Sequence, residues 1–334
     1  MQGGLNGKTY ETQAPVTGSV ALGERLVSAH GDGCLRLFRG GELERAVSAH
    51  SGVILDIARV DDQSVVTGGE DGRCLFVDVD GDIKSITGFD RRWVDCVACH
   101  KGAGYFACSA GREVRLIDFR GNQAQGISHP STVSDLAFDS KGERLAVTHY
   151  GGVTIWRLAD LDEEPLRLEW TGSHLAVSWS PDDQYLVTAM QENALHGWRL
   201  RDQLHMAMSG YSSKPRSLAW VGDKPHLATS GADQLVFWPF DAPEGPMGQT
   251  PLSINYRGEA QVACVNAMDG LPMVFAGLED GTVILAEPEE APRALLLRGP
   301  TGSEVTTLVA THDLSHFLVG DDRGGVFVAP LKAS

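Results

Sequence analysis

The sequence lacks the features that mark a membrane protein, an exported protein or a helical protein. No stretch of about 18 consecutive apolar residues occurs, so neither a membrane-spanning helix nor membrane insertion is expected. The first fifteen residues lack the basic segment followed by an apolar segment that forms a signal peptide. Apolar residues do not recur at helical spacing. These absences favour a cytoplasmic protein built from strands.

Basic residues are also scarce. The chain of 334 residues has 28 Lys and Arg against 44 Asp and Glu, a formal net charge of −16. Phosphate backbones repel such a surface, so a nucleic-acid partner is unfavourable. Neither a phosphate-binding P-loop nor a Gly-x-Ser-x-Gly nucleophile motif occurs, and most carboxylates lie in turn-like segments, where they form local hydrogen bonds. We therefore expect a protein that is not an enzyme and needs no cofactor.

The six cysteines suggest no disulfide framework, because they are scattered among strand-like apolar segments. The segment Cys96-Val-Ala-Cys99-His100 matches the spacing of a c-type haem attachment site. Haem attachment needs both thiols exposed on one flexible segment, whereas here an inner strand is predicted. Side chains alternate along a strand, so Cys96 and Cys99 should face opposite sides. Neither haem nor a metal ion is expected at this segment.

What the sequence does contain is a repeat of about forty residues. Its anchor is a short apolar run that ends in a small or hydroxyl residue and is followed by a Gly- or Asp-containing turn. Successive anchors are separated by 39 to 47 residues. The anchors end at Ser28, Thr67, Ser109, Thr148, Thr188, Thr229, Ala276 and Val319. Eight such steps occupy almost the whole chain, so residues 1–334 are predicted to form one domain.

Each repeat contains four short strand-like runs. In one repeat the runs are residues 53–60, 64–68, 74–78 and 83–87, and Glu70-Asp71-Gly72 is typical of a hairpin turn between the second and third. Four antiparallel strands repeated around an axis form a blade of a β-propeller. The predicted fold is therefore all-β.

The number of runs predicts how the ring closes. First, second and third runs occur eight times each, but fourth runs occur only seven times before the chain ends. Residues 7–13 precede the first repeat and are predicted to supply the missing outer strand of the last blade, which removes an open sheet edge. The prediction is one eight-bladed propeller of four-stranded antiparallel blades. The alternative is seven blades with an irregular N-terminal segment.

These residues resemble the WD40 repeat family, over about residues 16–330. Its members carry a His near the start of the blade, an Asp in the turn after the second strand and Trp-Asp at the end of the third strand. His50 and His129 resemble that His, and Asp78 and Asp118 retain the Asp after a replaced Trp. The turn Asp is matched by Asp32, Asp71, Asp233, Asp280 and Asp322, and the Trp by Trp156, Trp198 and Trp238. The resemblance implies a hydrogen-bonded His, Ser/Thr, Asp and Trp network that stabilises each blade. His129, Thr148 and Trp156 form the best partial set.

The loops of a four-stranded meander alternate between two faces. Loops after the first and third strands share one face, which is acidic and includes Asp61, Asp139 and Asp183; it is interpreted as a solvated face, or as a docking surface for a basic segment. The other face carries clustered Arg, Lys, Trp and Tyr, residue types typical of binding hot spots. The WD40 resemblance implies peptide binding there. The predicted partner-binding residues are Arg91, Arg92, Trp93, Tyr150, Lys214, Arg216 and Arg257, with Tyr211 adding aromatic area.

The resulting functional hypothesis is a non-catalytic, cytoplasmic scaffold that binds a protein or peptide partner on this second face. Blade packing is the alternative interpretation for Trp93, and an ordinary surface is the alternative for the charges. The alternative function is a metal-linked or hydrolytic propeller whose site lies in the central channel.

Overall fold

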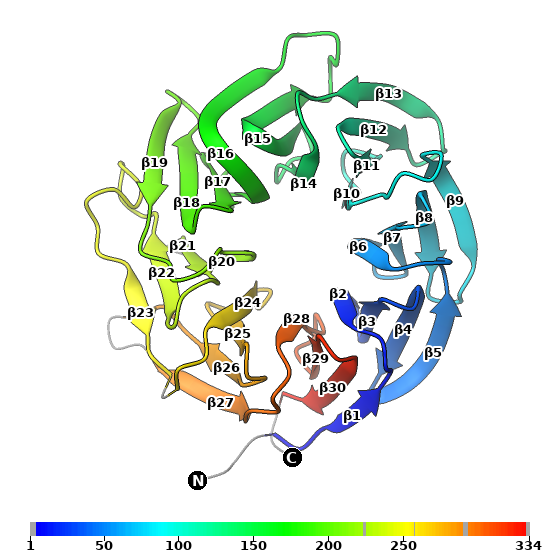
Figure 1. Ribbon diagram of the computed structural model, residues 1–334, viewed down its shortest axis with the longest axis vertical. Helices are drawn as coiled ribbons and strands as arrows, with labels where there is room; N and C mark the ends of the chain where they lie inside the picture. Colours follow the sequence, from blue (N-terminus) through cyan, green and yellow to red (C-terminus); the bar gives the residue numbers. More distant parts are fainter. Residues whose placement is uncertain (1–4, 223–224, 257, 290–292, 332–334) are drawn as a thin grey trace.

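The computed structural model describes residues 5–222, 225–256, 258–289 and 293–331. These residues form thirty strands and no helix. The sheets surround a central channel like blades (Figure 1). The all-β propeller predicted from the repeats is therefore confirmed.

The strands follow the repeats along the chain. The first sheet contains β2 (Val16–Leu22), β3 (Arg25–His30), β4 (Cys34–Arg39) and β5 (Glu42–Ser48). The second sheet contains β6 (Ile54–Asp61), β7 (Ser64–Gly69), β8 (Arg73–Asp78) and β9 (Ile83–Gly88). The third sheet contains β10 (Cys96–His100), β11 (Tyr105–Ala110), β12 (Glu113–Asp118) and β13 (Gln123–Ser128). The enlarged fourth sheet contains β14 (Val133–Phe138), β15 (Arg144–Arg157), β16 (Leu166–Trp179), β17 (Tyr185–Met190), β18 (Ala194–Arg199) and β19 (Leu204–Met208).

Three further sheets complete the ring. The fifth sheet contains β20 (Leu218–Val221), β21 (His226–Thr229), β22 (Leu235–Pro239) and β23 (Leu252–Ile254). The sixth sheet contains β24 (Val262–Ala267), β25 (Val274–Leu278), β26 (Val283–Ala286) and β27 (Ala294–Arg298). The last sheet contains β28 (Val305–Ala310), β29 (His316–Asp321), β30 (Gly325–Pro330) and β1 (Lys8–Glu11).

The number of sheets corrects the prediction of eight blades. Counted as hydrogen-bonded sheets, the described residues form seven blades, the number of the alternative: six have four strands and one has six. The cause is that the fourth and fifth repeats share a sheet. The 14-residue strand β16 pairs with β15 through its first half and with β17 through its second half. One strand therefore ends the fourth repeat and begins the fifth without an intervening loop.

Strand β15 also contains two of the expected runs. Its chain folds back at Gly151 and Gly152, and the N–H of Leu158, just beyond the strand, donates to Glu143 O, just before it, at 2.9 Å. The fourth and fifth repeats still pack against each other although their strands belong to one sheet. Val153 and Leu168 of the fourth repeat share one apolar cluster with Leu186 and Trp198 of the fifth. All eight repeats are present, and the enlarged blade holds two of them.

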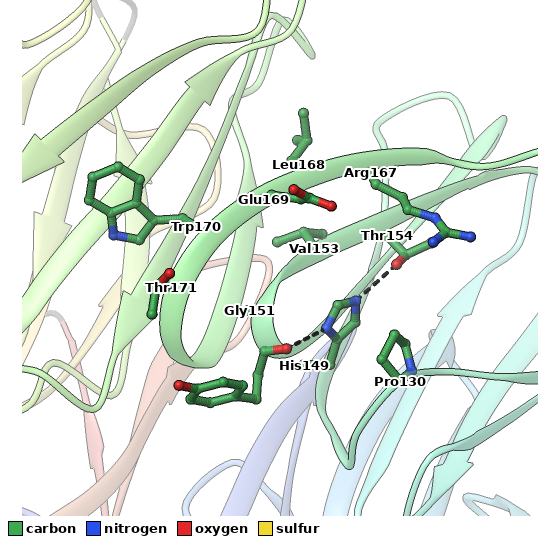
Figure 2. A pocket seen from close by; sticks show the side chains of 11 residues that line it. Pro130, His149, Gly151, Val153, Thr154, Arg167, Leu168, Glu169, Trp170 and Thr171 are labelled. Atoms are coloured by element: carbon green, nitrogen blue, oxygen red, sulfur yellow. Dashed lines mark hydrogen bonds between the residues drawn. The ribbon is translucent and has the colours of Figure 1, made fainter.

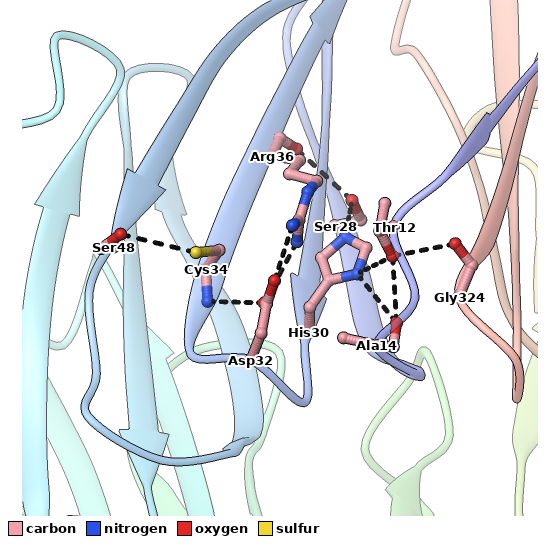
Figure 3. A network of polar contacts seen from close by, with 9 residues as sticks. All are labelled: Thr12, Ala14, Ser28, His30, Asp32, Cys34, Arg36, Ser48 and Gly324. Atoms are coloured by element: carbon pink, nitrogen blue, oxygen red, sulfur yellow. Dashed lines mark hydrogen bonds and ion pairs between the residues drawn. The ribbon is translucent and has the colours of Figure 1, made fainter.

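The closing strand is confirmed. β1 lies antiparallel to β30, with Lys8 opposite Val328 and Glu11 opposite Gly325. Just after β1, the Thr12 hydroxyl donates to Gly324 O at 2.9 Å, and its Oγ1 lies 3.3 Å from Nδ1 of His30 (Figure 3). The N-terminal segment therefore connects the last sheet to the first and covers an edge that would otherwise be open.

Side chains of the inner strands join consecutive repeats: Asp56 connects two neighbouring sheets, and Asp135 connects the two repeats that share the six-stranded sheet. Asp56 accepts a hydrogen bond from Val97 N at 2.7 Å, and Asp135 accepts one from Val177 N at 2.8 Å. Burial raises the pKa of Asp56 to about 7 and that of Asp135 to about 6. These carboxyls fix the register between consecutive inner strands at the cost of desolvating a titratable group.

Candidate protein-binding site

Two aromatic side chains are prominent on the face formed by the interblade loops and the turns after the second strands. Trp93, in the loop between β9 and β10, is 55% exposed, and Tyr150, at the bend of β15, is 59% exposed. Burying an exposed aromatic ring against a partner removes apolar area from water, which is favourable. Exposed rings of this size are therefore typical of binding surfaces. The exposed Trp93 does not fit the alternative that it serves blade packing.

A pocket of about 410 Å³ lies beside Tyr150 (Figure 2). Its walls are the bend and second arm of β15 and the first arm of β16, so the six-stranded sheet itself forms it. The lining residues are Pro130, His149, Tyr150, Gly151, Val153, Thr154, Arg167, Leu168, Glu169, Trp170 and Thr171. Pockets of this size accommodate small ligands or a few side chains of a peptide.

His149 holds the bend of β15 in place. Its Nδ1 lies 2.9 Å from Tyr150 O and its Nε2 lies 2.9 Å from the Thr154 hydroxyl. Because a carbonyl oxygen only accepts, Nδ1 carries the proton, and Nε2 accepts from Thr154. The Tyr150 backbone N–H also donates to the Ser131 hydroxyl at 2.9 Å. Both sides of the bend are therefore fixed, and the Tyr150 ring is presented from a rigid base.

Trp170, in β16, also lines the pocket. Its ring stacks on His196 with a centroid distance of 4.0 Å and an interplanar angle of 15°, and 37% of the residue remains exposed. Burial lowers the pKa of His196 to about 3, so this imidazole is neutral at physiological pH. A neutral stacked ring supports the indole without adding charge to the site. Trp170 and Arg167 were not predicted, because their place in the pocket depends on the shared strand β16.

The predicted basic residues are only partly available. Arg92 forms an ion pair with Glu113 at 2.6 Å, and Arg216 forms one with Glu304 at 3.3 Å. Lys214 Nζ donates to Gln191 Oε1 at 3.4 Å. Arg91 lies in the interblade loop with a φ of 69°. Arg257 lies outside the described residues.

The structure therefore brings the predicted residues into several places on this face rather than into one cluster. Lys214 and Arg216 line a small pocket, Tyr150 lines the pocket of Figure 2, and Arg92 is paired beside Trp93. Tyr211 does not add aromatic area to the surface: it is buried, and its hydroxyl bonds to Thr229 at 2.8 Å.

The blade networks implied by the WD40 resemblance are present in partial form. His50 lies 2.8 Å from Asp71 and 2.9 Å from the Thr67 hydroxyl. Two repeats later, the Trp156 indole donates to His129 Nε2 at 3.1 Å, whereas the Thr148 hydroxyl donates to Asp135 O. Burial lowers the pKa of His50 and lowers that of His129 to about 4, so both imidazoles favour the neutral form. These contacts join the strands within each repeat.

A third network explains the burial of Tyr211. The Trp238 indole donates to the Tyr211 hydroxyl at 2.7 Å, and that hydroxyl contacts Thr229. Tyr211 therefore occupies the place that His50 and His129 hold in the second and fourth repeats, a substitution that the His-based motif does not reveal.

The haem-like segment is a paired inner strand. Cys96 packs in the apolar cluster shared with the fourth repeat, whereas Cys99 packs toward the second, as predicted from alternation. Burial raises the pKa of Cys99 to about 12, so its thiol stays protonated. Both His100 nitrogens have partners, Ser140 O at 3.2 Å and Ala103 N at 3.0 Å. Across the described ranges, no group of three His, Cys, Asp or Glu side chains could hold a metal ion.

The acidic face consists largely of side chains that stabilise their own loops. Asp139 is buried and pairs with Arg144 at 2.6 Å. Asp61 accepts from Gln63 N and from the Ser64 hydroxyl, and Asp183 accepts from Ser140. These contacts match the expected role of Asp in turns.

Comparison with known proteins agrees with this architecture, although no family model matches the chain. The chain is 32% identical over 154 residues to WD repeat-containing protein 1-A of Xenopus laevis, an alignment that covers 42% of this chain and 25% of that relative. The repeats of this chain are therefore similar in sequence to WD repeats, and its fold is a β-propeller. The propeller is also 24% identical over 181 residues to the vacuolar protein sorting-associated protein 41 homolog of Arabidopsis thaliana, covering 54% of the chain and 15% of that relative.

A solved structure matches the whole propeller. The crystal structure of the computationally designed Ika8 protein superposes with a TM-score of 0.77 and 18% identity, over 98% of this chain and all of that one. At this identity the likeness establishes the fold alone. This chain spans about a quarter of its first curated relatives, so their activities as whole proteins are not transferred to it. Within the described part of the chain, no helix is long and apolar enough to cross a membrane.

Proposed function

We propose that this WD-repeat propeller is a non-catalytic, cytoplasmic scaffold that binds an extended segment of a partner protein on the face carrying Trp93 and Tyr150. Its fold and relatives support a protein-interaction scaffold in general. The finer assignment to this face rests on the pocket between Tyr150 and Trp170. The exposed rings of Tyr150 and Trp170 are held on strands β15 and β16, so a partner can bury their apolar area at little cost in side-chain entropy.

The chemistry of the pocket favours an extended segment with apolar side chains. Tyr150, Pro130 and Trp170 provide ring surfaces, while Arg167 and Glu169 provide one charge of each sign at the rim. Arg167 makes only a long, exposed ion pair with Glu164 at 3.7 Å, which a partner carboxylate can replace at small cost. Aromatic-lined grooves bind extended or proline-rich segments in this manner.

The test is quantitative capture from native lysate with the wild type and with Trp93→Ala/Tyr150→Ala. The matched control is Leu295→Ala, because Leu295 is 60% exposed on β27, away from this face. We expect one or a few proteins to be retained by the wild type and the control and lost from the double variant.

A partner that binds all three forms equally would move the site away from this face. If no protein is retained by any form, the scaffold assignment fails. In that case the alternative of a site in the central channel would have to be examined by measuring bound metal and hydrolytic activity.

A further inference from the structure

A second groove lies between the sheet of β6–β9 and the sheet of β10–β13, on the face that carries the loops after the first and third strands. It has a volume of about 420 Å³ and is formed by the β6–β7 loop, the outer strand β9, the β10–β11 loop and the β12–β13 turn. Its lining residues are Val60, Asp61, Ser64, Phe76, Lys84, Ser85, Ile86, Lys101, Phe106, Asp118, Phe119, Arg120 and Gly121. None of these residues belongs to the Tyr150 pocket.

The floor of this groove is aromatic. The rings of Phe106 and Phe119 lie 4.6 Å apart, and the Phe76 ring lies 6.4 Å from that of Phe106 in an edge contact. Phe106 is buried, but Phe119 stays 38% exposed although its backbone is fixed by a hydrogen bond from its N–H to Gly104 O at 3.1 Å. The groove thus presents a preformed apolar surface that can receive one large side chain.

The rim of the groove is cationic in a chain with a net charge of −16. Lys84, Lys101 and Arg120 surround the aromatic floor. Lys101 pairs with Asp61 at 3.3 Å, whereas Lys84 and Arg120 form no ion pair with any described residue. Asp118 offsets part of the Arg120 charge, although its carboxylate accepts hydrogen bonds from Arg120 N and from the backbone and side-chain amides of Asn122 rather than from the guanidinium. The lining therefore carries three cations against the two carboxylates of Asp61 and Asp118, a net positive charge that favours an anionic partner.

The groove also borders an unpaired strand edge. β9 is the outermost strand of its sheet in the described chain, and its residues Lys84, Ser85 and Ile86 line the groove. An extended peptide can pair its backbone with such an edge while placing a side chain into a neighbouring pocket. A small anion would use only the cations, so the edge and the aromatic floor together favour a peptide.

We propose that this groove binds an acidic peptide segment in which one large apolar side chain is flanked by carboxylates. The apolar side chain lies on Phe119 and Phe106, and the carboxylates lie against Lys84 and Arg120. This site is separate from the face assigned to the scaffold function, so the propeller can hold two segments at once.

The probe is a fluorescein-labelled ten-residue peptide with a central phenylalanine flanked on each side by glutamates, and its binding is followed by fluorescence anisotropy. Two comparison peptides replace the phenylalanine with alanine or the glutamates with lysines. We expect the first replacement to weaken binding about tenfold and the second to abolish it. Raising the salt concentration weakens binding of the original peptide, because exposed charges are screened.

The protein variants are Phe119→Ala and Lys84→Glu/Arg120→Glu. Each is expected to weaken binding of the glutamate peptide at least tenfold. The controls are Leu295→Ala for the exposed apolar residue and Arg45→Glu/Arg201→Glu for the charge reversal. Both controls should bind as the wild type does. Lys84 and Arg120 are exposed, so their reversal remains informative even if Phe119→Ala destabilises the fold.

Three results would overturn the proposal: no binding of the glutamate peptide up to about 1 mM, a weak limit for peptide recognition; equal binding of the lysine peptide; or unchanged binding after the charge reversal. Trp93→Ala/Tyr150→Ala must retain the peptide with wild-type affinity. If that variant alone loses it, the peptide belongs to the other face and this groove is not its site.

Discussion

Tyr10 on the closing strand β1 gives the most direct test of how the ring is held together. Its ring lies 5.2 Å from that of Phe38, a fully buried residue of the first sheet, and its hydroxyl donates to Gly41 O at 2.9 Å. Tyr10 itself sits in the last sheet, beside β30. One half-buried side chain therefore joins the first sheet to the last, across the point where the chain closes.

The expected cost of Tyr10→Ala follows from these contacts. Replacing a fully buried large aromatic residue with alanine costs about 3–5 kcal/mol, so a half-buried ring corresponds to about 2 kcal/mol. The unfolding entropy of a chain of 334 residues is about 0.7 kcal/mol per degree, from about 2.1 cal/mol/K per residue. The thermal midpoint should fall by about 3 °C. Tyr10→Phe, which loses only the hydroxyl contacts, should lose about 1 kcal/mol.

The assay is thermal and urea unfolding of wild type, Tyr10→Phe, Tyr10→Ala and a form lacking residues 1–14. The truncated form should unfold at the lowest temperature and should also self-associate in size-exclusion chromatography, because β30 then presents an open edge. Midpoints of Tyr10→Ala and the truncated form within about 0.5 °C of wild type would refute the reasoning, since that is well below the shift calculated above.

Three other predictions concern the interior. Asp56 and Asp135 have pKa values raised to about 7 and about 6 in the folded state, from 3.8, so the folded state binds more protons than the unfolded state between about pH 4 and pH 7. Their contribution to the free energy of unfolding therefore falls as the pH rises, for Asp56 by about 2–3 kcal/mol between pH 5 and pH 7.5. Asp56→Asn should flatten the slope of the free energy of unfolding against pH, measured by urea unfolding. An identical slope in the variant would contradict this. Gly152→Ala should destabilise the chain by more than about 2 kcal/mol, because φ is 143° and the added Cβ would meet Leu168 O. Gly151→Ala has open space around its Cβ and should cost only about 1 kcal/mol of backbone strain. Equal decreases in the free energy of unfolding in the two variants would show that the contact with Leu168 O does not matter. His50→Ala should cost about 2–3 kcal/mol, because it leaves the buried Thr67 hydroxyl without its partner and removes one hydrogen bond to Asp71. An unfolding midpoint equal to that of the wild type in the same assay would show that this network does not stabilise the blade.

The sequence by itself determined the repeat, the strand type and the closure. The steps between hydroxyl-ended runs gave the blade unit, and the missing fourth run predicted that residues 7–13 complete the last sheet, as β1 does beside β30. Alternation along a strand is enough to place Cys96 and Cys99 on opposite sides of β10. These features depend on local patterns of residue type, which the chain carries in its own order.

Only the tertiary structure decided the sheet count and the candidate sites. The 14-residue strand β16 continues through Gly172, which has a φ of 138°, so that two repeats share one sheet, and the repeat pattern did not predict this. Trp170 belongs to a candidate site only because the shared strand β16 brings it to the pocket beside Tyr150. Phe119 belongs to the second candidate site only because two neighbouring sheets leave a groove between them. Tyr211 shows the reverse: a residue expected at the surface is buried, because its hydroxyl replaces a histidine in a blade network. Sequence patterns fix which face of a strand is apolar, whereas pockets and pairings depend on how separate repeats pack, and one repeat does not encode the position of its neighbour's side chains.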